Sequence, residues 1–242
     1  RRISRVRKVM APKNGYEDWE ITQMLSNALG YPMNYKHASE IMDEVAQLTP
    51  TFKGVSYEKL DKLESIQWPC NDEFPEGTPT MHVDEFVRGK GKFFITEYVP
   101  TVEKVNGKFP LIMTTGRILA HYNVGAQTRR TKNSEWHDED LIEIHPHDAE
   151  ERGINERDWV GINSRSGDTV LRAKITDRVQ PGVVYTTFHH PVSGANVITT
   201  DNSDWATNCP EFKVTAVQVT KVTQPSNWQS KYQKFSEKQI DF

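Results

Sequence analysis

Three groups of polar residues in this 242-residue chain have side chains that could hold an anion or a polar ligand. The first group, Thr115-Gly116-Arg117 with His121-Tyr122, follows a short apolar strand expected at 111–113 and a small-residue turn at 114–116. Small residues leave backbone N–H groups accessible, and a neighbouring arginine can form paired hydrogen bonds with a phosphate or carboxylate. The stretch therefore predicts an anion- or nucleotide-binding loop. An ordinary loop with a surface arginine is the competing interpretation.

The other two groups also lie in expected loops or at expected strand ends. Phe188-His189-His190 is followed by Asn196 and Thr199-Thr200, and Pro210-Glu211-Phe212-Lys213 precedes the last expected strand. Barrels carry their ligand contacts in such positions. The three groups together predict a barrel that holds a cofactor or another ligand.

The spacing of other residues disfavours several chemistries. His145 and His147 are two residues apart and His189 and His190 are adjacent, and neither spacing suits two ligands of one metal ion. The sequence has no G-x-S-x-G, G-x-G-x-x-G or G-x-x-x-x-G-K-[ST] motif. From the residues alone, no catalytic group is visible.

Composition and charge exclude several classes of protein. The formal net charge of −3 does not indicate nucleic-acid binding, and 36% hydrophobic residues are adequate for a core. No apolar run approaches the ~20 residues that span a bilayer, and no signal-peptide pattern follows the basic start. Cys70 and Cys209 are far apart, which argues against an iron–sulfur or structural zinc site and suits the cytosol. Because the chain does not begin with Met, we expect a fragment or a processed product.

The first part of the chain is expected to be helical and then irregular. Apolar spacing predicts a helix over 18–29 with Ile21, Met24 and Leu25 on one face. A second helix is predicted from Ser39 to Thr49, and a shorter one from Ser56. Residues 65–108 are rich in proline and glycine, include a candidate strand at 93–96, and are the natural place for a domain boundary.

From Phe109 the pattern changes to short strands separated by turns. Further strands are predicted at 141–144, 159–163, 169–175, 183–188 and 214–222, with a short helix between Pro146 and Gly153. Many short strands with one small helix are typical of a closed β-barrel. Residues 223–242 are polar and are predicted to form a tail or a partner-binding arm.

Several segments give the chain a resemblance to a known family. They include GYPM (30–33), IQWPC (66–70), TTGRILAHYNVGAQTRR (114–130), IHPHDAEERGI (144–154) and ANVITTDNSDWATNCPEFKVTAVQV (195–219). Together they resemble the C-terminal part of the catalytic (alpha) subunit of molybdenum-dependent formate dehydrogenases, in the molybdopterin-guanine-dinucleotide oxidoreductase superfamily. The NAD-linked, cytoplasmic type is the nearest match, and the resemblance covers nearly the whole chain.

The resemblance implies an α/β fold followed by a mainly β fold. Residues 1–108 would be the C-terminal remnant of a large α/β cofactor-binding region plus a crossing segment. Residues 109–222 would form a six-stranded double-psi β-barrel, and residues 223–242 a polar tail. In the family this barrel covers one side of two pyranopterin guanine dinucleotides, held jointly with upstream domains, and their dithiolene sulfurs hold molybdenum or tungsten.

The resemblance also implies which residues contact this cofactor. Backbone N–H groups and arginines suit a pyrophosphate, and asparagine or histidine suits the amide edge of a pterin. The family's metal ligand, catalytic arginine and iron–sulfur ligands lie upstream, so no catalytic residue and no metal ligand is implied here. The implied cofactor-binding residues are Thr115, Gly116, Arg117, His121, Tyr122, Thr128, Arg129, Arg130, Phe188, His189, His190, Asn196 and Lys213.

Whole enzymes of this family oxidise formate to carbon dioxide and pass electrons through Fe-S (iron–sulfur) clusters to NAD. The expected partners are the rest of the catalytic subunit and iron–sulfur or flavin electron-transfer subunits, with no nucleic acid and no membrane span. We expect this chain alone to be inactive. Another bis-pterin oxidoreductase, such as a nitrate reductase, and a non-catalytic ligand-binding barrel are the alternatives.

Overall fold

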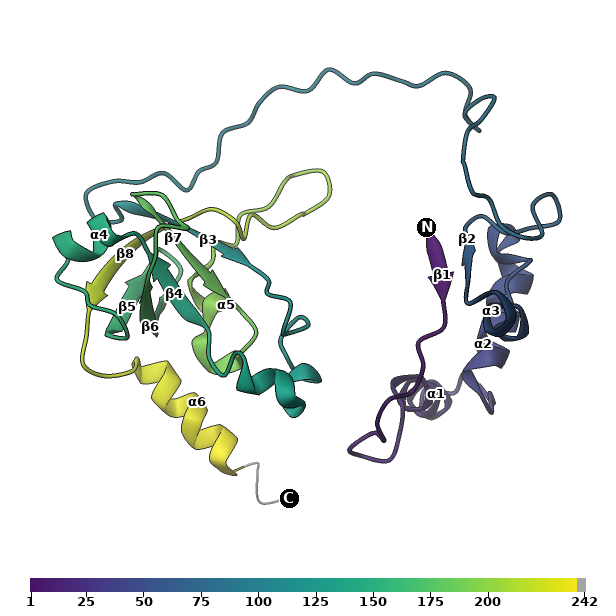
Figure 1. Cartoon of the computed structure of the whole chain (residues 1–242), viewed down its shortest axis with the longest axis horizontal. Helices are drawn as coiled ribbons and strands as arrows, with labels where there is room; N and C mark the ends of the chain where they lie inside the picture. Colours follow the sequence, from purple (N-terminus) through teal and green to yellow (C-terminus); the bar gives the residue numbers. More distant parts are fainter. Residues whose placement is uncertain (239–242) are drawn as a thin grey trace. The chain divides into compact units, whose positions relative to one another are not determined.

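A computed structural model describes residues 1–238 of the chain. They form two compact units, Arg1–Thr96 and the part that begins at Glu97. Figure 1 colours the first unit purple to blue and the barrel of the second teal to yellow. Each unit has a buried core of its own.

The first unit combines three α-helices with a two-stranded antiparallel ribbon. All three predicted helices are confirmed, with small shifts at their starts: Glu17 and Glu20 form a capping box before α1, and His37 caps α2. Ser56 caps α3 as predicted. The elements are β1 (Arg2–Ser4), α1 (Asp18–Ala28), α2 (Ala38–Leu48), η1 (Pro50–Phe52), α3 (Tyr57–Leu63) and β2 (Ser65–Gln67).

The core of this unit is small, and most of its helical surface is exposed. Val55, Leu60, Ile66 and Cys70 form its buried cluster. Neither α1 nor α2 contributes a buried residue. The apolar face predicted for α1 is therefore present in the helix but is not covered within the unit.

The candidate strand at 93–96 is wrong. Residues 79–110 contain no helix or strand. Phe93 and Ile95 are each 98% exposed, and no neighbouring segment offers them a ladder of hydrogen bonds. Apolar residues alone do not form a strand without a partner to pair with.

The second unit is a closed barrel of six strands in the order β3-β7-β4-β6-β5-β8. Each predicted strand is confirmed within one residue at its ends, except the first, which extends to Gly116. Residues 114–116 are therefore not the predicted turn: they pair with residues 185–187 of β7. The strands are β3 (Leu111–Gly116), β4 (Leu141–Ile144), β5 (Trp159–Asn163), β6 (Asp168–Ile175), β7 (Val183–Thr187) and β8 (Thr215–Lys221).

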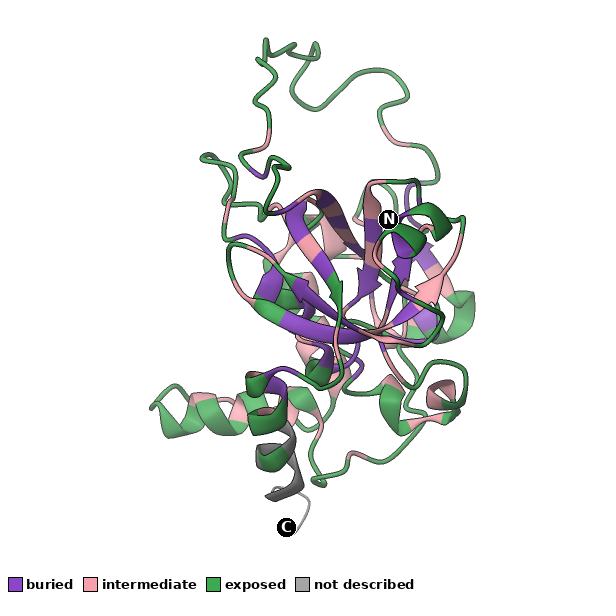
Figure 2. Ribbon diagram, turned by 90° about the vertical axis from the view of Figure 1, so that its left-hand side faces the viewer, coloured by how far each residue is buried: buried purple, intermediate pink, exposed green. Residues whose placement is uncertain are grey.

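Two strand pairs of the barrel are parallel, β3 with β7 and β4 with β6, and the other neighbours are antiparallel. This is the predicted six-stranded double-psi β-barrel. Figure 2 shows many buried residues in its strands. Along β3, Leu111, Met113 and Thr115 are buried and the residues between them are partly exposed. Fourteen buried residues make one continuous core, so the strand ends are held rigidly.

Short helices and helical turns connect the strands. The predicted short helix is α4 (Pro146–Glu151), which His145 caps and which is followed by Gly153 in the left-handed region at φ +61°. The other connecting elements are η2 (Thr128–Arg130), η3 (Lys132–Glu135), η4 (Pro191–Ser193) and α5 (Ala195–Ile198).

The segment predicted as a polar tail contains a helix. Residues 227–238 form α6 (Asn227–Lys238), the yellow helix of Figure 1. Residues 239–242 of the predicted tail lie outside the described part of the chain. No helix within residues 1–238 has both the length and the hydrophobicity to cross a membrane.

Candidate functional site

The strand order brings the three polar groups to one rim of the barrel. Because β3 and β7 are parallel, Gly116 and Thr187 lie side by side where the two strands end. Strand β8 runs antiparallel to β3 and begins at the same rim. The Lys213 ammonium donates to the Thr115 carbonyl, and the Thr115 hydroxyl donates to the Phe212 carbonyl at 3.0 Å. The segments 115–117, 188–190 and 212–213 therefore form one site.

His189 ties the first two segments together. Its ring is fully buried, and the Ile118 N–H donates to its Nε2 at 3.2 Å. Nδ1 therefore carries the ring proton and donates to the Asn123 carbonyl. Both ring nitrogens are satisfied inside the protein, so His189 orients the loop that follows β3.

His121 has a similar internal position. Its Nε2 donates to the His137 carbonyl at 2.7 Å, and its Nδ1 accepts from the Thr128 hydroxyl at 3.0 Å. The same hydroxyl accepts from the Tyr122 N–H at 3.2 Å. His121 and Thr128 thus fold residues 121–130 into a compact loop.

Two glycines allow close packing at this rim. A Cβ on Gly116 would lie 2.5 Å from the Tyr185 hydroxyl oxygen. Gly125 has φ +71°, and a Cβ there would lie 2.6 Å from the His189 carbonyl oxygen. A side chain on Gly116 would collide with the Tyr185 ring of β7, and one on Gly125 would push its loop away from the His189 carbonyl.

The buried carboxylate of Asp140 holds the loop that follows β7, residues 188–196, which is the second loop of the rim. Asp140 is not among the residues singled out from the sequence. It accepts from the Thr187 hydroxyl and from the backbone N–H groups of His189 and His190, the latter two at 3.2 and 2.8 Å. Burial alone would raise the pKa of Asp140, but contacts with the His190 side chain and the Thr187 hydroxyl lower it to about 2. Asp140 is therefore a fixed negative charge beneath the loop.

His190 lies directly against this charge. Its Nδ1 is 3.3 Å from the Asp140 Oδ1, but it has no well-aligned hydrogen bond, and its side chain is 9% exposed. Its ring meets the His121 ring edge-on, with centroids 5.2 Å apart. His190 is thus the one rim histidine whose ring nitrogens are not both hydrogen-bonded within the described residues.

The outer surface of the rim is cationic. The Arg117 guanidinium lies over the Phe188 ring, 5.3 Å from its centroid. Arg129 and Arg130 are exposed in η2, and none of these three arginines forms an ion pair with a carboxylate in residues 1–238. Uncompensated arginines on a rigid frame are a ready binding surface for phosphate groups.

The predicted site residues therefore divide into two sets. One set holds the two loops in place, and its residues are buried or hydrogen-bonded within the protein. The other set faces solvent and is free to bind a ligand. The first set is Thr115, Gly116, His121, Thr128, His189 and Lys213; the second is Arg117, Tyr122, Arg129, Arg130 and Asn196. Phe188 is half-buried and His190 is buried between them.

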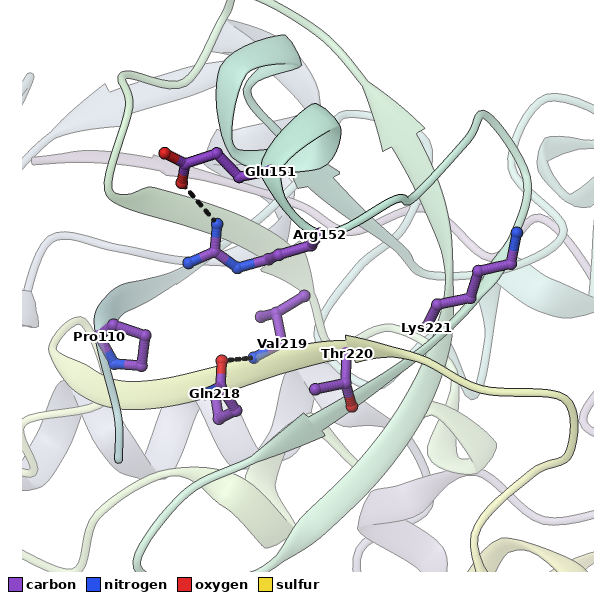
Figure 3. Close-up of a pocket in the computed structure, with 7 residues that line it drawn as sticks. All are labelled: Pro110, Glu151, Arg152, Gln218, Val219, Thr220 and Lys221. Atoms are coloured by element: carbon purple, nitrogen blue, oxygen red, sulfur yellow. Dashed lines mark hydrogen bonds and ion pairs between the residues drawn. The ribbon is translucent and has the colours of Figure 1, made fainter. Parts of the chain in front are cut away.

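A shallow hollow between α4 and β8 has none of these residues. Figure 3 shows Arg152 in this hollow, bonded to Glu151, with Gln218 and Thr220 of β8 below. Nearby, His147, Asp148 and Glu151 have ligand atoms within 4.8 Å of one another. Asp148 already accepts from the Gly182 N–H at 2.8 Å, and the Arg152 cation lies 3.9 Å from its other oxygen. We assign no metal ion to this cluster.

Comparisons with known proteins identify relatives of this chain. Residues 111–216 match the family described as molydopterin dinucleotide binding domain. Over 228 residues the chain is 39% identical to the F420-dependent formate dehydrogenase subunit alpha of Methanocaldococcus jannaschii, covering 92% of this chain and 34% of the relative. It is 32% identical to formate dehydrogenase H of Escherichia coli, covering 90% of this chain and 32% of that protein.

The fold also has a counterpart among solved structures. Acetylene hydratase from Pelobacter acetylenicus aligns with a TM-score of 0.55 and 12% identity, over 86% of this chain and 33% of that chain, which supports the fold alone. The chain spans about a third of the length of the curated relatives named above. Residues 111–216 belong to the molydopterin dinucleotide binding family, and the chain is a homologue of part of the formate dehydrogenase alpha subunits.

Proposed function

We propose that the rim of the barrel grips a pyranopterin guanine dinucleotide through the exposed residues of its two loops. The observation that carries this proposal is the set of arginines 117, 129 and 130, which have no acidic partner in the described chain. Such a surface favours a dianionic pyrophosphate. The buried frame beneath it keeps the arginines in place, so binding does not have to order the loops.

The remaining residues of the rim fit the other parts of such a ligand. Asn196 is exposed and its side-chain amide can pair with the amide edge of a pterin. Phe188, stacked under Arg117, offers an apolar surface for a ring. When bound, the dinucleotides supply the dithiolene sulfurs that hold molybdenum or tungsten. The residues of this chain bind and orient, and none takes a catalytic role.

For the whole protein we propose formate oxidation to carbon dioxide, with electrons leaving through iron–sulfur clusters. This rests on relatives that are named as formate dehydrogenases. The predicted NAD link has no support from them, since the relative from Methanocaldococcus jannaschii is named F420-dependent. We therefore leave NAD and F420 as the two acceptors to compare, with the rest of the alpha subunit and electron-transfer subunits as partners, in the cytoplasm.

The test is cofactor analysis of the intact protein. Iodine oxidation of the purified full-length protein should release fluorescent pterin in stoichiometric amount, and Arg117→Ala should lower that amount. The Arg117→Lys variant is the matched control, because it keeps the charge but loses the paired donors. Absence of pterin from the wild-type protein would favour the alternative of a non-catalytic ligand-binding barrel.

A second assay compares the possible reactions of the whole enzyme. We expect formate-dependent reduction of F420 or NAD by the complete protein and no such activity from residues 1–242 alone. Turnover of nitrate in place of formate would identify another bis-pterin oxidoreductase. The identities of 39% and 32% to proteins named as formate dehydrogenases favour formate.

A further inference from the structure

Helix α6 makes specific contacts with the barrel although it lies beyond the family match at residues 111–216. Two consecutive residues at its start, Trp228 and Gln229, form hydrogen bonds with the barrel and with one of its loops. Gln229 is only 6% exposed, which is unusual for an amide side chain on a polar helix. Buried amides stay buried only when their donors and acceptors are satisfied.

The Gln229 amide completes the edge of strand β6. Strand β4 pairs with β6 only from Arg172 onward, which leaves Val170 without a strand partner on that side. The Gln229 Oε1 accepts from the Val170 N–H at 3.1 Å, and its Nε2 donates to the Val170 carbonyl at 2.8 Å. The side chain thus takes the place of a missing strand residue.

The same amide also holds the second rim loop. The Gln229 Nε2 donates to the Val192 carbonyl at 3.0 Å. One residue further, the Ser193 hydroxyl donates to the His190 carbonyl at 2.7 Å. Two hydrogen bonds, one to Val192 and one from its neighbour Ser193, thus link helix α6 to the backbone of His190.

Trp228 presses on the other end of this loop. Its Nε1–H donates to the Asp168 carbonyl at 2.7 Å, and its ring covers Gly194. A Cβ on Gly194 would lie 1.9 Å from the ring carbon Cζ2, and Gly194 has φ +59°. Glycine is thus required at position 194, both for the left-handed backbone conformation and to leave room for the Trp228 ring. Asn196 follows it in α5.

We propose that Trp228 and Gln229 are positioning residues: the start of α6 clamps residues 190–196 and so fixes His190 and Asn196 at the rim. The part of the inference that concerns cofactor rests on the proposed function, whereas the clamp itself does not. A cavity of about 220 Å³ lies beneath the contact, lined by residues that include Asp140, Val192 and Gln229. The clamp acts through these hydrogen bonds and through the Trp228 ring over Gly194, and its loss should loosen the loop and spare the barrel core.

Hydrogen–deuterium exchange on the 242-residue chain tests the clamp. In Trp228→Ala and Gln229→Ala we expect the amides of residues 190–198 to exchange at least tenfold faster, while β4 and β7 keep their protection. Trp205→Ala and Gln224→Ala are matched controls, since both residues are exposed and have no side-chain hydrogen bond within the described chain. Unchanged exchange at 190–198, or an equal rise across the whole barrel, would refute the clamp.

Conservative variants separate the two contacts. Trp228→Phe keeps a ring over Gly194 but loses the Nε1–H donor, so its exchange rate should fall between wild type and Trp228→Ala. Gly194→Ala should accelerate exchange by collision with the ring, and part of that effect should disappear in Gly194→Ala/Trp228→Ala. Additive effects in the double variant would mean that the ring does not press on Gly194.

Pterin content of the full-length protein connects the clamp to the site. The alanine variants of Trp228 and Gln229 should carry at least threefold less pterin than wild type, and the two controls should match wild type. Faster exchange at 190–198 with full pterin content would leave the clamp standing and refute its role in cofactor binding. A wild-type protein without pterin would refute the proposed function and leave the exchange result unaffected.

Discussion

The two loops of the rim have opposite arrangements of charge. Residues 117–130 expose three arginines, and a frame of neutral hydrogen bonds through His121, Thr128 and His189 supports them. Residues 188–196 expose mainly neutral groups, and the buried carboxylate of Asp140 supports them from below. The difference indicates that the first loop attracts a charged ligand and that the second loop fixes the position of a neutral one.

Removal of the charged support should have the largest effect. Asp140→Ala leaves the Thr187 hydroxyl and two backbone N–H groups buried without an acceptor, and we expect the free energy of unfolding to fall by about 3–5 kcal/mol. Urea denaturation measures this. Asp138→Ala is the matched control, because Asp138 is exposed. Equal losses in both variants would mean that the second loop has no special dependence on Asp140.

The neutral frame of the first loop should be sensitive to volume instead. Gly116→Ala places a Cβ 2.6 Å from the Tyr185 Cε2, so we expect a loss of about 1–3 kcal/mol in unfolding free energy. Gly107→Ala is the control, since no atom lies within 4 Å of its added Cβ. If Gly116→Ala is as stable as its control, the close packing of β3 against the Tyr185 ring of β7 does not limit the rim.

A pH titration tests the charged support of Asp140 alone, because protonation does not change the volume of the side chain. The pKa of Asp140 is about 2 in the folded chain against 3.8 for an ordinary aspartate, so the folded state binds its proton less readily. Its contribution of about 2 kcal/mol is fully present above pH ~4 and is lost as the pH falls toward 2. The pH-dependent loss should shrink in Asp140→Asn. That variant is needed because Asp204 also titrates near 2. A loss that stays the same in Asp140→Asn would exclude Asp140 as its source.

The smallest effect on stability is expected at the exposed arginine. Arg117→Ala removes one cation–π contact, so the free energy of unfolding should change by less than about 1 kcal/mol. The same change should nevertheless lower the pterin content of the full-length protein. Full cofactor occupancy in Arg117→Ala would show that the cationic loop does not grip the ligand.

Much of the barrel and part of the site could be predicted from the sequence. Short apolar runs separated by turns predicted the six strands, apart from the last three residues of β3, and the expected strand ends marked the polar groups that meet at the rim. Asp140 could not be singled out, because it follows two similar acidic residues, Asp138 and Glu139. Only the pairing of β4 with β7 places it beneath His190.

The contacts of α6 could not be predicted for a related reason. Its first turn has few apolar residues, and it is attached by side-chain hydrogen bonds from Gln229 and Trp228 that leave no periodic pattern. Residues 93–96 show the reverse case, a strand-like composition without a partner strand. The composition of a segment indicates whether it can be buried. The elements that it pairs or packs with are set by the tertiary structure of the closed barrel.

The pairing of β3 with β8 joins the first and last strands of the barrel, and it has a kinetic consequence. This junction has only three residue pairs, Leu111–Met113 against Thr215–Val217, and the contacts of Thr115 with Phe212 and Lys213 prolong it at the rim. It joins two strands that are far apart in the sequence, so we expect it to be a late step of folding. A dinucleotide bound across this junction would stabilise the closed barrel, and would slow its opening far more than it speeds its closure.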